Sequence, residues 1–172
     1  MTEPTIAADL TTAFRNAMRR MASTVTIITA TDFGRHHGMT VTAVTSVSMN
    51  PPSLLVCLNN RTRLHDIMGQ ARRFCVNVLH TEQAELSVAF SGALPAEERF
   101  DKGAWQKTED GLGFLIDAQA NVFCQKMAAI PFGTHTIFIG QVVEVRQGDA
   151  VEPLIYQNAS YRAFSSGLTV GK

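Results

Sequence analysis

Hydroxyl groups recur along residues 38–52, which read GMTVTAVTSVSMNPP. The even positions carry Thr40, Thr42, Ser46 and Ser48, whereas the odd positions are mostly apolar. Because successive side chains of a strand point to opposite faces, the pattern predicts a strand with a row of hydroxyls on one face. Threonine is also common in ordinary exposed strands, and composition alone favours that simpler interpretation.

A second polar group follows the apolar run SLLVCLN at residues 53–59. That run leads into Asn59, Asn60, Arg61 and Thr62, directly before a segment with helical spacing. An arginine, a hydroxyl and free backbone amides at the start of a helix suit a phosphate group. A ligand with a polar chain along the hydroxyl row and a phosphate at this loop would fit both segments.

Other kinds of catalytic site find little support in the sequence. It contains no GxSxG or SxxK motif for a nucleophile, and its carboxylates cluster in segments typical of solvated surface. GLGFLI at residues 111–116 is not a GxGxxG fingerprint, and no GK[ST] phosphate loop is present, so a nucleotide must be held in another way.

Metal binding is not expected either. Cys57, Cys75 and Cys124 lie far apart in apolar segments and are interpreted as buried, reduced thiols. His36 and His37 are adjacent, so on a strand they would face opposite sides.

Periodicity indicates which elements position these groups. Apolar residues at helical spacing from Leu10 to Met21 predict an opening amphipathic helix, and two short helices are expected at residues 61–70 and after residue 81. Strands are expected from Thr24, over 38–50 with a bend or break, over 53–59 with both faces buried, from Arg73, and over 120–127, 134–145 and 154–156. Many strands with hairpin-length turns indicate a mainly β chain that forms a closed or nearly closed antiparallel barrel with peripheral helices.

Bulk properties limit the remaining function classes. A chain of 172 residues is most simply one domain, 1–172. Lys plus Arg and Asp plus Glu each number 15, so no nucleic-acid or acidic membrane partner is expected. No apolar run approaches the roughly 20 residues of a membrane span, and the N-terminus lacks signal-peptide features, so we expect a cytoplasmic protein.

The order and spacing of several segments resemble those of the short-chain flavin reductases, the reductase components of two-component monooxygenases such as phenol, chlorophenol or 4-hydroxyphenylacetate hydroxylases. The resemblance covers residues 14–164 and depends on FRNAM, residues 38–59, RFCVNVL, AFSG, RFDKGAW, GTHTIFIGQVVEV and PLIYQNASYR. It implies a homodimeric antiparallel split β-barrel of Greek-key type. Such a protein binds FAD or FMN without a covalent bond, reduces it with NADH or NADPH, and supplies diffusible reduced flavin to a separate monooxygenase.

The same resemblance implies the residues of the site. Flavin is expected to contact Met39, Thr40, Thr42, Ala43, Val44, Thr45, Ser46, Ser48, Asn59, Asn60, Arg61, Thr62, Phe90, Ser91, Gly92, Arg99 and Phe100. His135 is expected to position the nicotinamide, with Phe14, Tyr161 and Arg162 on the same side. No residue is assigned a catalytic role with certainty, because hydride passes directly between two cofactors.

One alternative belongs to another functional class: a flavin- or haem-binding split-barrel protein without turnover. The sequence leaves open the choices between FAD and FMN and between NADH and NADPH. It also leaves open whether the flavin is a prosthetic group or a substrate, and which monooxygenase it serves.

Overall fold

The computed structural model describes residues 3–149 and 151–163, with side chains from residue 9 onward. The helices are α1 (Glu3–Met18), α2 (Arg63–Gln70) and α3 (Ala84–Val88), with the short helical turns η1 (Thr81–Gln83), η2 (Ala89–Ala93) and η3 (Arg99–Asp101). The strands are β1 (Ser23–Thr24), β2 (Thr26–Asp32), β3 (Arg35–Val41), β4 (Val44–Met49), β5 (Pro52–Asn59), β6 (Arg73–Val78), β7 (Trp105–Lys107), β8 (Gly113–Leu115), β9 (Ala120–Phe132), β10 (His135–Gln147), β11 (Ile155–Gln157) and β12 (Ser160–Arg162).

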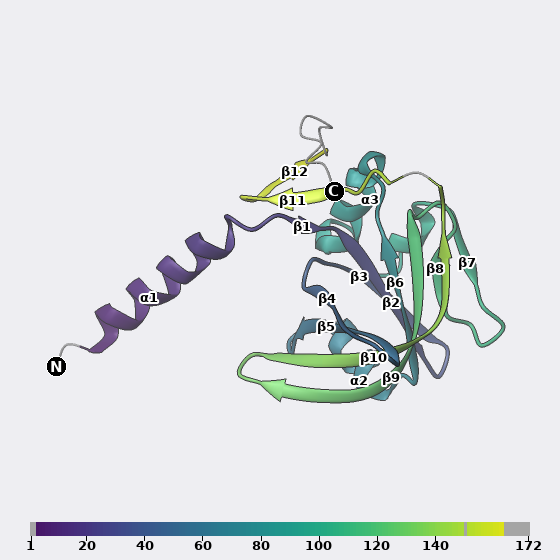
Figure 1. The fold of residues 1–172 in the computed structure, drawn as a ribbon, viewed down its shortest axis with the longest axis horizontal. Coiled ribbons are helices and arrows are strands. Elements are labelled where there is room, and N and C mark those ends of the chain that lie inside the picture. The colour runs from purple at the N-terminus through teal and green to yellow at the C-terminus, as the bar shows by residue number, and fades with distance from the viewer. Residues whose placement is uncertain (1–2, 150, 164–172) are drawn as a thin grey trace.

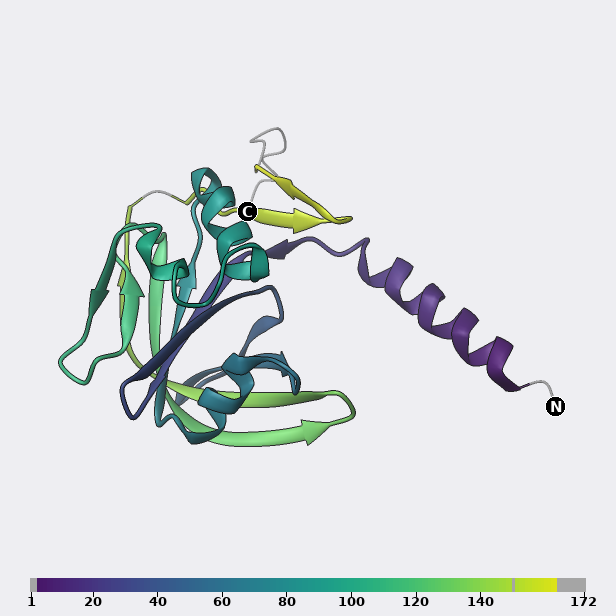
Figure 2. The same cartoon turned by 180° about the vertical axis from the view of Figure 1, so that it is seen from behind.

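Seven strands form one antiparallel sheet in the order β3-β2-β6-β9-β10-β5-β4. Its two edge strands, β3 and β4, are joined by Thr42 and Ala43 alone. In a flat sheet, six spacings of about 4.8 Å would separate these edges by about 29 Å, whereas three Cα steps of about 3.8 Å span at most about 11 Å. The sheet must therefore curl into a barrel, as Figures 1 and 2 show.

The barrel has an apolar interior that α2 helps to close. Leu64, Ile67 and Met68 of α2 are buried in one cluster with strand residues such as Val56 and Phe138. A second cluster outside the barrel packs β2 against α3 and η2. β2 is consequently buried along most of both faces.

The sequence missed the short strands β7 and β8, which a buried amide attaches to the barrel. Asn77 on β6 donates from Nδ2 to the Ile27 carbonyl at 2.8 Å and accepts at Oδ1 from the Leu115 amide of β8 at 2.9 Å. Asn121 Nδ2 also donates to Asn77 Oδ1, at 3.0 Å. Three-residue strands held by such distant partners leave little periodicity to read.

The expectation for residues 53–59 differs from the structure. β5 does not have both faces buried: Leu54, Val56 and Leu58 are buried, whereas the side chains between them are only half-buried. The reason is that β5 neighbours the edge strand β4, and little of this chain covers its outer face. The opening helix forms, but α1 extends away from the barrel with Leu10 and Phe14 exposed (Figures 1 and 2).

Gly140 provides a test of this packing. It lies at an irregularity of β10, where an added Cβ would meet the Phe74 ring and come within 2.8 Å of the Cys124 Cβ. We predict that Gly140→Ala lowers the free energy of unfolding by about 2 kcal/mol because the barrel interior would be overpacked.

Urea unfolding of the flavin-free protein measures this effect. Gly148→Ala is the matched control, since a Cβ there meets nothing within 4 Å, and its stability should change by less than about 0.5 kcal/mol. Equal stability of the two variants would show that the barrel interior is looser than described.

Candidate functional site

The connection between β3 and β4 presents exposed polar groups. Thr42, Thr45 and Ser46 are exposed, and within the described ranges their hydroxyls make no hydrogen bond. β3 and β4 are also sheet edges, so outward backbone amides and carbonyls have no strand partner. We call this region, the outer edges of β3 and β4 with their connection, the seam. It offers hydroxyls and backbone donors to a ligand.

The remaining hydroxyls of the row serve the fold. Thr40 Oγ1 donates to the Ser87 carbonyl of α3 at 2.7 Å, and Ser48 Oγ accepts from the Asn50 amide at 3.1 Å. Met39 and Val44 pack against the barrel core. The predicted row of hydroxyls is therefore divided into a group exposed at the seam and a group bonded within the fold. The reason is that the β3–β4 connection interrupts the alternation of the long strand.

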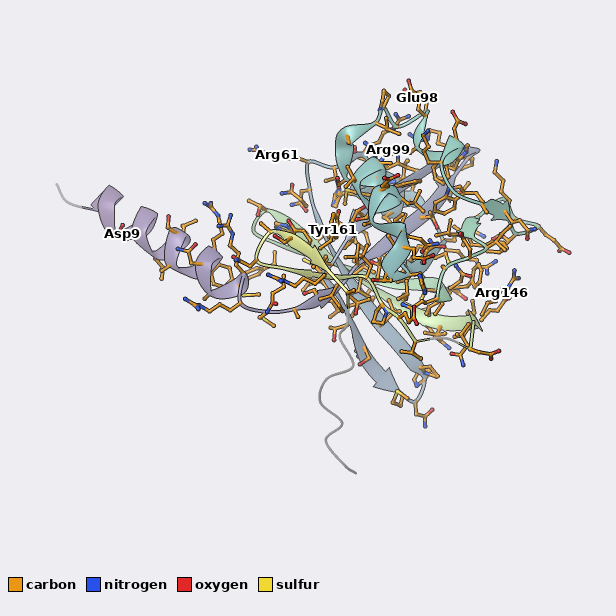
Figure 3. The ribbon with its side chains drawn as sticks, turned by 90° about the horizontal axis from the view of Figure 1, so that it is seen from above. Asp9, Arg61, Glu98, Arg99, Arg146 and Tyr161 are labelled. Atoms are coloured by element: carbon orange, nitrogen blue, oxygen red, sulfur yellow. The ribbon has the colours of Figure 1, made fainter. Side chains whose placement is uncertain are left out.

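The loop after β5 is shaped by its own side chains. Thr62 caps α2, accepting from the His65 amide at 3.3 Å and donating to the Asn59 carbonyl at 2.8 Å. Asn59 Oδ1 accepts from the Arg61 amide at 2.9 Å. The Arg61 side chain is exposed and extends outward from the ribbon (Figure 3). An arginine beside a helix start suits an anionic group.

Asn60 joins this loop to the turn between β9 and β10. Its amide donates to the Thr134 carbonyl at 3.0 Å, and its Oδ1 accepts from Thr136 Oγ1 at 2.9 Å. The buried Thr136 hydroxyl is also hydrogen-bonded to His65 Nε2 at 3.0 Å. His135 pairs with Asn59 in the strand register, so the expected phosphate loop and the expected nicotinamide histidine belong to one hydrogen-bonded unit.

Sequence reasoning missed Thr136 and His65. Thr136 lies more than 70 residues along the chain from both of its partners, Asn60 and His65, and no local pattern signals these pairings. His135 itself is exposed, with Nδ1 2.9 Å from Thr134 Oγ1.

The segments AFSG (residues 89–92) and RF (residues 99 and 100) lie against β3, the first strand of the seam. Arg99 donates from Nη1 to the Gly38 carbonyl at 3.2 Å and from Nε to the Leu94 carbonyl at 3.0 Å. The Phe100 ring packs edge-on against His36, with centroids 5.0 Å apart. Arg99 and Phe100 are thus placed beside β3.

Phe90, Ser91 and Gly92 have mainly structural contacts. Phe90 is fully buried and packs on Phe100 and Trp105, so the structure gives it a packing role. Ser91 Oγ donates to the Val88 carbonyl at 2.8 Å, and Gly92, with φ 114°, forms a non-helical kink inside η2.

His37 is a buried residue of β3 that lies near positively charged side chains. The residue is 4% exposed, and its pKa is lowered to about 4, first by burial and then by the nearby Arg99 and Arg63 guanidiniums. A neutral histidine is favoured where two cations approach. Arg63, which the sequence did not single out, therefore adds positive charge beside β3, which Glu97 partly offsets.

The four residues expected near nicotinamide are not all together. Phe14 lies on the projecting helix α1, away from the barrel (Figure 1). Tyr161 shares a hydrogen bond of 2.9 Å with Ser87 Oγ, and Arg162 follows it on β12. In a single chain only His135 lies directly beside the loop at residues 59–62.

Other chemistries find no centre in the described residues. No group of three or more His, Cys, Asp or Glu side chains lies close enough there to hold a metal ion. The three cysteines are free, and burial raises the pKa of Cys75 and raises that of Cys124 to about 12, so neither supplies a thiolate. Within the same ranges, no helix has the length and hydrophobicity needed to cross a membrane.

Comparison with known proteins decides the family. The model of the flavin reductase like domain matches residues 18–165. The chain belongs to this family. Both the predicted family and the predicted split-barrel fold are confirmed.

Individual relatives of the chain are named as reductases. The reductase component of an FADH2-dependent resorcinol hydroxylase from Rhizobium sp. (strain MTP-10005) is 55% identical over 88% of this chain and 86% of that protein. The FMN reductase (NADH) RutF of Agrobacterium fabrum is 40% identical, over 87% and 86%. The NADH:FAD oxidoreductase SgcE6 of Streptomyces globisporus, solved with NAD and FAD fragments, matches with a TM-score of 0.84 and 26% identity over 91% and 93%.

The burial of His37 predicts a pH-dependent stability. The folded protein holds the pKa at about 4, whereas an unfolded histidine titrates near 6.5, so below about pH 6.5 the unfolded state binds more protons. The stabilisation is complete above that pH and is lost as the pH falls toward 4. The total is at most about 3 kcal/mol.

Urea unfolding at pH 7, 5.5 and 4.5 tests this linkage. His37→Gln should lose less stability over this range than wild type, whereas the exposed neighbour variant His36→Gln should follow wild type. If the wild type and His37→Gln had the same slope, burial of His37 would not be the cause.

Proposed function

We propose that the protein is an NADH-dependent flavin reductase that delivers reduced flavin to a separate monooxygenase. The observation that carries this proposal is the seam, whose exposed hydroxyls lie on the β3–β4 connection and on β4, the strand that leads into β5 and the loop at residues 59–62. Relatives named as NADH-dependent flavin reductases support it.

The residues present fit a flavin. Thr42, Thr45 and Ser46 have hydroxyls available for a polar chain, and the edge amides of the connection suit carbonyl and ring-nitrogen acceptors. Arg61 supplies an exposed guanidinium for phosphate, and Arg63 adds positive charge nearby. The chemistry that bound flavin supplies is the acceptance of hydride from a nicotinamide.

In this proposal the protein contributes position rather than proton transfer. His135 orients the nicotinamide, and the Asn60–Thr136 hydrogen bond holds its hairpin to the phosphate loop. Orientation of two reactants at contact distance can supply much of the rate acceleration of an enzyme.

FAD is the flavin we favour, and an aromatic hydroxylase is the partner we favour. The support is the relative at 55% identity, which is named as the reductase of an FADH2-dependent resorcinol hydroxylase. FMN is the second candidate, because several relatives at 35–40% identity are named FMN reductases.

We also propose that the functional unit is a homodimer. Large apolar side chains are exposed on the β4–β5 and β9–β10 hairpins, where Met49 is 85% and Phe132 is 82% exposed, and on α1. Monomeric proteins seldom expose apolar groups so extensively, and two-fold dimers are the commonest assembly.

NADH oxidation measured with added FAD or FMN tests the activity and His135 together. Wild type should oxidise NADH far beyond its own concentration. His135→Ala should raise the KM for NADH or slow flavin reduction by about 10-fold, which corresponds to about 1.4 kcal/mol. Flavin affinity should be unchanged, and the rate should lack a steep dependence between pH 6 and 7, because no proton passes through this residue.

Two outcomes would overturn these assignments separately. If wild type fails to turn over NADH with either flavin yet binds flavin, the protein is a binding module. If His135→Ala has wild-type kinetics, the nicotinamide lies elsewhere.

Mass measurement in solution at micromolar concentration tests the dimer. We expect twice the chain mass for wild type and a shift toward monomer for Phe132→Asp, which places a charge on the exposed apolar hairpin. Phe33→Asp is the control, since Phe33 is 98% exposed at the β2–β3 turn and should leave the dimer intact. An active wild-type monomer would exclude the proposed assembly.

A further inference from the structure

A basic cleft lies where α1 ends beside the β11–β12 hairpin. It has a volume of roughly 670 Å³ and is lined by Asn16, Arg19, Arg20, Gln157, Asn158 and Arg162. No acidic side chain lines it, and none of its three arginines takes part in an ion pair within the part of the chain that the structure describes. A volume of this order suits a nucleotide-sized ligand rather than a single small ion.

The fold holds the two sides of the cleft together. The Asn158 amide donates to the Arg19 carbonyl at 3.0 Å, and Gln157 Nε2 donates to the Arg20 carbonyl at 3.2 Å. Asn158 and Ala159 form a two-residue hairpin turn with φ of 48° and 59°, a conformation typical of tight antiparallel hairpins. Figures 1 and 2 both show the hairpin tip beside the segment that leaves α1. The arginines therefore belong to a defined arrangement.

The same hairpin is anchored to the seam. Tyr161, the neighbour of Arg162, shares a hydrogen bond with Ser87 Oγ at 2.9 Å. The carbonyl of Ser87 accepts from Thr40 Oγ1 on β3 at 2.7 Å. One residue of α3 thus connects the strand that carries Arg162 to the strand that leads into the free hydroxyls of the seam.

We propose that this cleft binds the diphosphate of the adenylate half of the nicotinamide dinucleotide. Guanidinium groups match phosphate oxygens in pairs, and three of them exceed the two negative charges of a diphosphate. The proposal rests on the proposed reductase function, in which the nicotinamide reaches the flavin at the seam. The flavin phosphate has a separate candidate loop at residues 59–62, so the two anionic groups do not compete for the same arginines.

Comparison of NADH with reduced nicotinamide mononucleotide tests the cleft, because the mononucleotide lacks the adenylate half. The variant Arg19→Gln/Arg20→Gln should raise the KM for NADH by about 5-fold or more, with hydride transfer from the mononucleotide unchanged. Arg15→Gln, in the last turn of α1, is the control: it removes one nearby arginine charge but does not line the cleft, and it should behave as wild type.

ADP provides a second measurement, in which the wild-type protein alone is already informative. It should inhibit wild type competitively against NADH, and the inhibition should weaken with added salt and in the double variant. Equal changes in the KM for NADH and the mononucleotide, unchanged kinetics with both, or noncompetitive ADP inhibition would each overturn the proposal. Any of these results with an active wild type would contradict only the cleft proposal. If wild type did not turn over NADH, the proposed reductase function itself would be contradicted.

Discussion

The two-residue connection between β3 and β4 is the constraint on which the rest of the structure depends. Because Thr42 and Ala43 join the first and last strands of a seven-stranded sheet, the sheet has to close on itself. Closure encloses an apolar interior that α2 covers, yet the two joined strands remain edges without a further partner. The unpaired backbone and hydroxyl groups of the seam therefore follow from the same constraint that makes the barrel.

Peripheral segments are attached to this frame by a few polar contacts. Asn60 and Thr136 hold the loop after β5 to the β9–β10 hairpin, and Ser87 connects β3 with the C-terminal hairpin through Thr40 and Tyr161. Each contact joins segments that are far apart in the sequence. Thr136 and Ser87, which are not expected to contact flavin or nicotinamide, thus help to position residues that are.

Positive charge is concentrated in two regions of the surface. The chain has no net charge, but arginines gather beside β3 and in the cleft at the end of α1. Local positive regions on a neutral protein favour small anions over an extended polyanion such as nucleic acid. The buried thiols and the neutral His37 offer no reactive group, which agrees with an enzyme whose cofactors carry the chemistry.

Local patterns by themselves determined the mainly β class, the helix that buries Leu64 and Ile67, and the loop that Thr62 caps, because these depend on spacing within a few residues. The family likewise followed from ordered segments of sequence. Only the tertiary structure decided which hydroxyls are engaged: Thr40 and Ser48 bond to Ser87 and Asn50, whereas Thr42, Thr45 and Ser46 have no hydrogen bond within residues 3–149 and 151–163. It also decided that one face of β5 stays half-exposed, that Thr136 bonds to Asn60, and that Arg19 and Arg20 share a cleft with Arg162. Each of these depends on a partner brought in by strand order or by a turn elsewhere in the chain, and the local periodicity of a sequence carries no information about such a partner.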